Sequence, residues 1–321
     1  MLMTEMLDTT IMSWSNALAN AGQAKLTRSR YESAVRAFVA WFEKHNNEPF
    51  TPGRLTPIDL TAYRNQLQTE AAASTVNVHL CALRSFCAWL TEHGRVPTDP
   101  SARIKAVGTP APLAPKSLTA PQINALLREA QQTRHAARDY AIVQMLVQTG
   151  LRIGECVALR LADVQMSERQ GQVTVRAGKG NKFRVVPLNA SARRALLEYL
   201  AMLWSVSVDW PMVLAAWRIH PATTPLWHSQ KGNRLSVRAM SGMVEQIVTL
   251  CVQRGLVPKE TSAHTLRHTF ATAYLKDYPN DLVGLAALLG HESLETTRIY
   301  VQPTAADLAQ RVEKTRLNAY A

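Results

Sequence analysis

The chain has 321 residues, of which 47% are hydrophobic and 19% charged, so it is long enough for two globular domains and too apolar for an intrinsically disordered chain. Its formal net charge of +12 favours a polyanionic partner, with nucleic acid first and an anionic membrane surface second. We find no apolar run long enough for a transmembrane helix, and no basic N-terminus followed by an apolar stretch. We therefore expect neither a membrane span nor a secretory signal.

The cysteines indicate a reducing compartment. Four are present, each within an apolar helical pattern, and none forms a C-x-x-C pair. We expect buried, reduced thiols in a cytosolic protein, with neither disulfides nor a zinc site. They are Cys81, Cys87, Cys156 and Cys251.

Helical periodicity dominates the first third of the chain. Apolar residues recur at intervals of three or four, and Thr56 followed by Pro57 is typical of a helix start. The pattern predicts a small all-helical bundle that ends near Gly94. Its helices are expected near residues 5–20, 31–42, 57–67 and 76–90.

A basic segment with five prolines, residues 95–116, shows no periodicity and is typical of an extended linker. We predict a domain over residues 1–95, a linker over 96–116 and a second domain over 117–321. No internal repeat or low-complexity segment is evident.

The second domain mixes helices with a hairpin. Helical patterns run from Thr119 to Gly150, and apolar residues then alternate with polar ones on either side of a Gly-Lys-Gly-Asn turn at 178–181. Helices are expected again over 190–203, 237–254 and to the end, whereas 204–224 has no clear pattern. The sequence thus predicts a mainly α domain with a small antiparallel sheet.

Four clusters of polar residues carry the chemistry. They are TGLRIGE at 149–155, the turn around Lys179, HTLRHTFAT at 264–272, and LGH at 289–291 followed nine residues later by Tyr300. In this order, behind a linker, they resemble the tyrosine recombinase (lambda integrase) family, and most closely its simple Xer-type members. The resemblance covers roughly the whole chain and is weakest in the N-terminal bundle.

The resemblance implies a fold and a reaction. The expected fold is mainly α, with an N-terminal helical core-binding (SAM-like) bundle and an α-rich catalytic domain holding a small antiparallel β-sheet. The expected activity is site-specific cleavage and rejoining of DNA through a 3′-phosphotyrosyl intermediate and a Holliday junction. It would serve the integration, excision or resolution of DNA elements.

The matched positions suit one DNA phosphate. Arg152 and Arg267 match the two family arginines, whose planar guanidiniums can meet the phosphate oxygens of a charged transition state. Tyr300 matches the nucleophile, and its phenol needs activation because its ordinary pKa is about 10. His264 and His291 match the two remaining phosphate-site positions.

A lysine supplies the expected general acid. Lys179 matches the family residue that protonates the leaving 5′ oxygen, with Lys182 and Arg184 as rivals whose simpler role is contact with backbone phosphate. Glu155, within one helical turn of Arg152, resembles the family acid that supports the site without reacting. We interpret His268 as structural.

The resemblance also implies partners. The expected partners are double-stranded recombination sites and further copies of the chain, as a dimer on one site and a tetramer in the synapse, with accessory DNA-binding proteins as a further option. We expect a C-shaped clamp on DNA, a C-terminal helix over 305–317 that docks on its own domain or a neighbour, and a place in the cytoplasm with the nucleoid. The first domain's candidate DNA contacts are Arg28, Arg30, Asn77, His79 and Arg84.

No cofactor is called for. No metal-ligand spacing accompanies the histidines, and ATP is unnecessary because the phosphotyrosine stores the bond energy. Two other classes stay open: a type IB topoisomerase-like enzyme, and a catalytically idle DNA-binding protein of the same fold. The biological role and the target DNA sequence are not readable from the residues.

Overall fold

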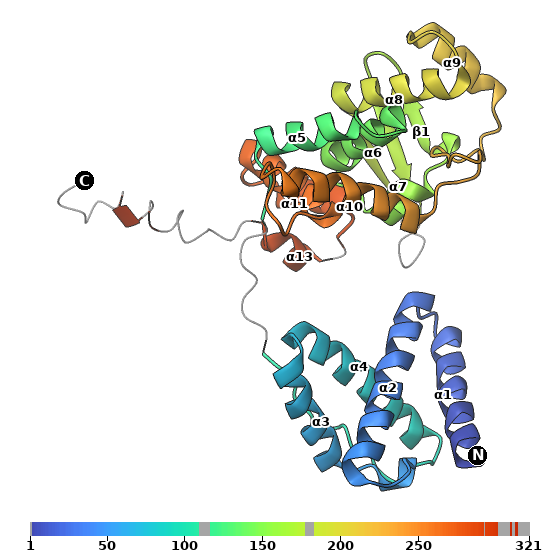
Figure 1. Ribbon diagram of the computed structural model, residues 1–321, viewed down its shortest axis with the longest axis vertical. Coiled ribbons are helices and arrows are strands. Elements are labelled where there is room, and N and C mark those ends of the chain that lie inside the picture. The colour runs from blue at the N-terminus through green and yellow to red at the C-terminus, as the bar shows by residue number, and fades with distance from the viewer. Residues whose placement is uncertain are drawn as a thin grey trace. The chain divides into compact units, whose positions relative to one another are not determined.

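The computed structural model describes residues 2–108, 116–176, 183–291, 293–300, 309 and 312–313 (Figure 1). The chain divides into two compact units, Met1–Ala111 and Pro112–Ala321. Within the described residues, no helix is both long and apolar enough to cross a membrane. The predicted turn at 178–181, with Lys179 and Lys182, lies outside the described residues, as does most of the predicted helix 305–317.

The first unit is a helical bundle. Thr56 starts one helix with a reciprocal capping box to Asp59. Phe38 lies at the centre of the core and meets the rings of Phe50 and Tyr63 edge-on, at centroid distances of 6.0 and 5.1 Å. The predicted bundle is confirmed, and its elements are α1 (Leu2–Asn20), α2 (Lys25–Asn46), the 3-10 turn η1 (Pro52–Arg54), α3 (Pro57–Glu70) and α4 (Ala73–Glu92).

The second unit is mainly helical around a small sheet. Its helices are α5 (Ala120–Ala130), α6 (Ala136–Thr149), α7 (Ile153–Ala158), α8 (Ala190–Trp204), α9 (Trp210–Ile219), α10 (Val237–Gln253), α11 (Ala263–Asp277), α12 (Leu282–Leu289) and α13 (Leu294–Arg298). A 3-10 turn, η2 (Leu161–Asp163), precedes the sheet. Helix α6 is buried over most of its length and packs against α5, α8 and α11. The core therefore holds the C-terminal end of α6 and the whole of α11 in fixed positions.

The sheet has the order β1-β2-β3, with both pairs antiparallel: β1 (Val164–Met166), β2 (Gly171–Val175) and β3 (Arg184–Pro187). Val173 and Val186 are register partners, and both are buried. The β2–β3 pairing confirms the predicted hairpin. Strand β1 is an addition, because three residues are too few to show an alternating pattern.

Two expectations differ from the structure. The stretch without a clear pattern contains α9, which is capped by Asp209 and has Pro211 in its first turn. Cys81 is exposed rather than buried, since it lies on the outer face of α4, while the other three cysteines are buried; all four are free thiols.

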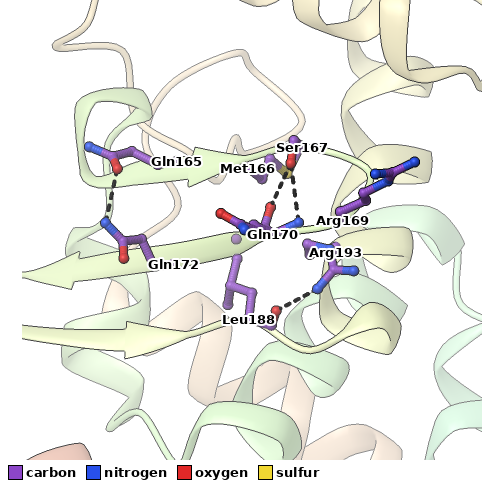
Figure 2. A pocket seen from close by; sticks show the side chains of 9 residues that line it. Gln165, Met166, Ser167, Arg169, Gln170, Gln172, Leu188 and Arg193 are labelled. Atoms are coloured by element: carbon purple, nitrogen blue, oxygen red, sulfur yellow. Dashed lines mark hydrogen bonds between the residues drawn. The ribbon is translucent and has the colours of Figure 1, made fainter.

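A cavity of about 530 Å³ opens beside the turn that joins β1 to β2 (Figure 2). Polar side chains line it, including Gln165, Gln172 and Arg193, and the Arg193 guanidinium donates to the carbonyls of Leu188 and Glu168. None of the predicted catalytic side chains lines this cavity.

Candidate active site

Arg267 is the centre of the predicted site. It lies on α11, which begins with a capping box between Ser262 and Thr265, and its side chain is almost fully buried. Its guanidinium donates to the Gly150 carbonyl at 2.6 Å and to the Leu289 carbonyl at 2.7 Å. Carbonyls at helix ends have no partner within their helix and carry partial negative charge, so a buried cation is well matched to the ends of α6 and α12.

These two hydrogen bonds set the positions of two other predicted residues. Arg152 follows Gly150 by two positions, and His291 follows Leu289 by two. Arg267 therefore joins segments that are far apart in the chain. A guanidinium has more N–H donors than these two bonds use, so Arg267 can still bind a phosphate.

Gly150 makes the turn before Arg152 possible. Its backbone is left-handed, with φ of 63°, and a Cβ there would lie 2.6 Å from the Phe270 ring and 2.8 Å from the Leu289 side chain. Only glycine combines this conformation with this close approach. The chain can then leave α6 and enter α7 at Arg152.

Glu155 binds both the backbone and the side chain of Arg152. It accepts the backbone N–H of Arg152 at 2.9 Å and one guanidinium nitrogen of the same residue at 2.9 Å. Arg184, on β3, donates two hydrogen bonds to the same carboxylate, at 3.0 and 2.7 Å, and a third to the Leu288 carbonyl at 2.9 Å. Burial opposes ionisation of Glu155, but the hydrogen bonds from Arg184 and Arg152 outweigh it and lower its pKa.

Tyr300 lies among three histidines. Its hydroxyl is 2.8 Å from Nδ1 of His268, whose ring meets that of His264 edge-on with centroids 4.3 Å apart. The ring of His291 is parallel to that of Tyr300 at 6.4 Å, and its Nδ1 lies 2.8 Å from the Thr297 hydroxyl. The nucleophile candidate thus lies beside imidazoles from α11 and from His291, just after the end of α12.

Burial and positive charge set the electrostatics. Burial, with the nearby charges of Arg267 and Arg152, lowers the pKa of His291 to about 4. Burial, then His264 and Arg267, lowers the pKa of His268 to about 4 as well. These imidazoles are neutral at pH 7, so the arginines supply the positive charge for an anionic ligand.

Burial and neighbouring charges also shift the pKa values of Tyr300 and Arg267. Burial raises the pKa of Tyr300, and the charges of Arg267 and Arg152 oppose that rise. Burial, followed by repulsion from Arg152, lowers the pKa of Arg267 to about 10. The phenol and both guanidiniums are therefore close enough to interact electrically.

The structure brings most of the predicted catalytic residues together. They are Arg152, His264, Arg267, His291 and Tyr300, with Glu155 beside them. Arg184 is 15% exposed and bonded within the unit, so its guanidinium faces Glu155. His268, interpreted from sequence as structural, contacts the Tyr300 hydroxyl directly. Its spacing of four residues from His264 on one helix was the signal that it shares a face with that residue.

The candidate DNA contacts of the first unit divide into two groups. Asn77 exchanges two hydrogen bonds with the backbone of Val107, and Arg84 donates to the Ile104 carbonyl, so both hold the end of the unit against α4. Nδ1 of His79 is hydrogen-bonded to the Tyr63 hydroxyl at 3.0 Å.

The remaining two candidates lie on α2. Nε of Arg28 is buried and has no hydrogen-bond partner among the residues that the structure describes. Arg30 lines a groove of about 380 Å³ between α2 and α4, together with Ser33, Ser74 and His79. Over the described ranges, no group of three His, Cys, Asp or Glu side chains is placed to hold a metal ion.

Known proteins with similar sequences support the same class. Residues 116–307 match the phage integrase family, and residues 11–93 match the N-terminal SAM-like domain of phage integrases. The chain is 31% identical over 289 residues to tyrosine recombinase XerC of Pelobacter propionicus, across 90% of this chain and 88% of the relative. It is 30% identical over 290 residues to tyrosine recombinase XerD of Yersinia pestis, across 89% and 90%.

Solved structures share the fold. The XerH site-specific recombinase bound to a palindromic difH substrate, in a post-cleavage complex, has a TM-score of 0.69 at 23% identity, across 90% of this chain and 78% of that one. A lambda integrase (75–356) dimer bound to a COC′ core site has a TM-score of 0.68 at 18% identity, across 92% and 95%.

The family matches define the class: an enzyme that cleaves and rejoins DNA, built here as a helical bundle followed by an α-rich unit with a small sheet. The chain belongs to the phage integrase family and, within it, to the Xer-type tyrosine recombinases, so its reaction is site-specific recombination. The predicted family, fold class and reaction are thereby confirmed.

Proposed function

We propose that Tyr300 is the nucleophile of this recombinase and that Arg152, His264, Arg267 and His291 bind the scissile phosphate. The observation that carries the proposal is the pair of hydrogen bonds from Arg267 to the carbonyls before Arg152 and before His291. They gather the arginines and imidazoles around one phenol. Arg152, with a side chain 47% exposed, is free to turn from Glu155 towards a bound phosphate.

The reaction follows from these positions. The Tyr300 oxygen attacks phosphorus, the bond to the 5′ oxygen breaks, and the products are a 3′-phosphotyrosyl strand and a free 5′-hydroxyl. The guanidiniums stabilise the extra negative charge of the five-coordinate transition state. Attack of a 5′-hydroxyl from the partner duplex then releases Tyr300, and two such exchanges form and resolve a Holliday junction.

Lys179 is the proposed general acid for the leaving 5′ oxygen, and Lys182 is the alternative; both lie outside the described residues. The surroundings of Arg184 argue against its having this role. All three of its guanidinium nitrogens are bonded within the unit, and an arginine does not release a proton in proteins. We infer that Arg184 supports Glu155 and that its N–H groups outside these three bonds can contact backbone phosphate.

We propose that residues 1–95 form the core-DNA-binding domain, residues 96–116 the linker, and residues 117–321 the catalytic domain. The groove beside Arg30 and the side chain of Arg28 support phosphate contact by α2. Asn77 and Arg84 would contribute by holding the end of the bundle in place, and His79 by lining the groove.

We further propose a dimer on each recombination site and a tetramer in the synapse, located with the nucleoid in the cytoplasm, where its DNA substrate is. Accessory DNA-binding proteins are optional in this scheme. Support comes from the lambda integrase relative, which was solved as a dimer on a core site. The segment 305–317 would pass between neighbouring copies, and deletion of residues 304–321 should abolish cooperative synapsis.

The test uses nicked suicide duplexes in EDTA, built from sites that the protein selects out of a randomised library. A covalent protein–DNA adduct on a denaturing gel is expected for the unchanged chain and should disappear in Tyr300→Phe. Tyr278→Phe is the matched control, because Tyr278 is an exposed tyrosine of the same unit and should keep full adduct yield. An adduct that persists in Tyr300→Phe would refute the assignment. Recombination of a two-site plasmid separates this activity from topoisomerase-like relaxation.

A further inference from the structure

The Tyr300 hydroxyl is held by a histidine outside the set of residues matched above. Its partner among the described residues is Nδ1 of His268, at 2.8 Å. We propose that His268 holds the Tyr300 hydroxyl in place and accepts its proton as the phenol attacks DNA. This inference rests on the proposed role of Tyr300 as nucleophile.

Position on α11 explains why His268 can do this. His264 and His268 are four residues apart and share one face of the helix, while Arg267 points into the core. The centroid of the His268 ring lies 4.3 Å from that of His264 and 5.4 Å from that of Tyr300. Since Arg267 is fixed by two carbonyls, its neighbour His268 is fixed against Tyr300.

The other histidines are less suited to the task. Nδ1 of His291 is bonded to the Thr297 hydroxyl, and its ring lies parallel to Tyr300 at 6.4 Å without contacting the hydroxyl. His264 meets His268 edge-on, and no hydrogen bond joins it to Tyr300. Both are therefore left to bind phosphate, and His268 is the imidazole in contact with the reacting oxygen.

The charge state of His268 suits a proton acceptor. Burial, then His264 and Arg267, keeps its pKa low, so the ring is neutral at pH 7, while burial keeps Tyr300 protonated. An incoming phosphate would offset the charge of Arg267 and thereby raise the basicity of His268. Proton transfer then depends on bound DNA, which protects the resting enzyme from carrying an activated phenolate.

The step balances as follows. The bond between the Tyr300 oxygen and phosphorus forms, the bond from phosphorus to the 5′ oxygen breaks, and the phenol proton moves to Nδ1 of His268. The leaving oxygen takes a different proton, from the lysine general acid. In religation the 5′-hydroxyl loses its proton to that lysine, and Tyr300 recovers its own from the His268 imidazolium.

Two variants separate holding from proton transfer. Asparagine at 268 places an amide near the position of Nδ1, so His268→Asn can hold the hydroxyl but cannot accept its proton, whereas His268→Ala does neither. Single-turnover cleavage should fall about 100-fold or more in His268→Ala, as for loss of a general base. Cleavage by His268→Asn should remain at least about tenfold slower than cleavage by the unchanged chain. Both rates should rise with pH between 7 and 9, whereas the unchanged chain stays nearly level.

A duplex with a 5′-bridging phosphorothiolate distinguishes the base from the acid. Its sulfur leaves without a proton, so this duplex should restore Lys179→Ala but not His268→Ala. His220→Ala, at the end of α9, is the matched histidine control and should cleave normally. Thermal unfolding and DNA binding, measured on every variant, identify any that fail to fold, and His268→Asn then carries the test.

Three results would overturn the inference: normal cleavage by His268→Ala, a normal rate and level pH profile for His268→Asn, or rescue of His268→Ala by the phosphorothiolate. Each leaves the Tyr300 adduct of the unchanged chain intact and so spares the proposed nucleophile. Failure of the unchanged chain to form that adduct would instead refute the proposed function itself.

Discussion

Replacement of Glu155 by glutamine tests how much its ion pairs with Arg184 and Arg152 stabilise the second unit. The side chains of Glu155 and Arg184 are 12% and 15% exposed, so this ion pair is largely buried. Removal of one partner of a buried pair costs roughly 3–5 kcal/mol, because the other charge stays buried without its counterion. Because the glutamine amide keeps one acceptor oxygen, we expect the variant to lose about 3 kcal/mol of unfolding free energy, at the lower end of this range. The pair with Arg152, whose side chain is 47% exposed, should add less than about 1 kcal/mol.

The assay is urea unfolding of the full chain, followed by circular dichroism and tryptophan fluorescence. Glu198→Gln is the matched control, because Glu198 pairs with Arg194 on the surface of α8, with side chains 40% and 61% exposed. An exposed pair on one helix contributes only about 0.3–0.5 kcal/mol. For Glu155→Gln, the loss of about 3 kcal/mol in unfolding free energy should appear in the transition of the second unit alone.

The cleavage assay gives a second readout for Glu155→Gln. Glu155 accepts the backbone N–H that starts α7 and one nitrogen of the Arg152 guanidinium, so the variant should also cleave more slowly at temperatures where it is folded. Equal losses of stability in Glu155→Gln and Glu198→Gln would refute the reasoning. So would a loss below about 1 kcal/mol, because the pair would then behave as a solvated one.

Three further predictions concern stability. Gly150→Ala should cost roughly 2–4 kcal/mol in urea unfolding, from left-handed strain and from contacts at 2.6 and 2.8 Å. Gly154→Ala, within α7 and with open space around it, should instead leave stability unchanged or raise it by up to about 1 kcal/mol. Stability of the second unit should fall as pH drops from about 6.5 to 4, because unfolding lets two histidines with low folded pKa values bind protons. It should fall further below about 4.5 as Glu155, whose folded pKa is lowered, is protonated; a level profile from pH 7 to 4 would contradict both. Asn77→Ala should cost about 1–3 kcal/mol in the first unit, because the backbone of Val107 loses both partners, and proteolysis should then cut near residue 107; an unchanged cleavage pattern would count against it.

The sequence alone determined the elements and the family. Helix starts such as Thr56 and Thr119 depend on side chains three residues away, and amphipathic spacing is equally local, so both are readable without coordinates. The motifs around Arg152, Arg267 and Tyr300 were likewise readable, because each is a short run at fixed spacing. Strand β1 and helix α9 were missed, since a three-residue strand and a tryptophan-rich stretch carry little periodic signal.

Tertiary structure alone decided how the site is held together. Arg267 reaches the Gly150 carbonyl across 117 positions, and Arg184 reaches Glu155 across 29; no local pattern encodes which distant group a guanidinium will meet. The same holds for His268, whose contact with Tyr300 spans 32 positions and turns an expected structural residue into the partner of the nucleophile. Local patterns report which elements form, whereas hydrogen bonds between distant segments exist only after the core has packed those elements together.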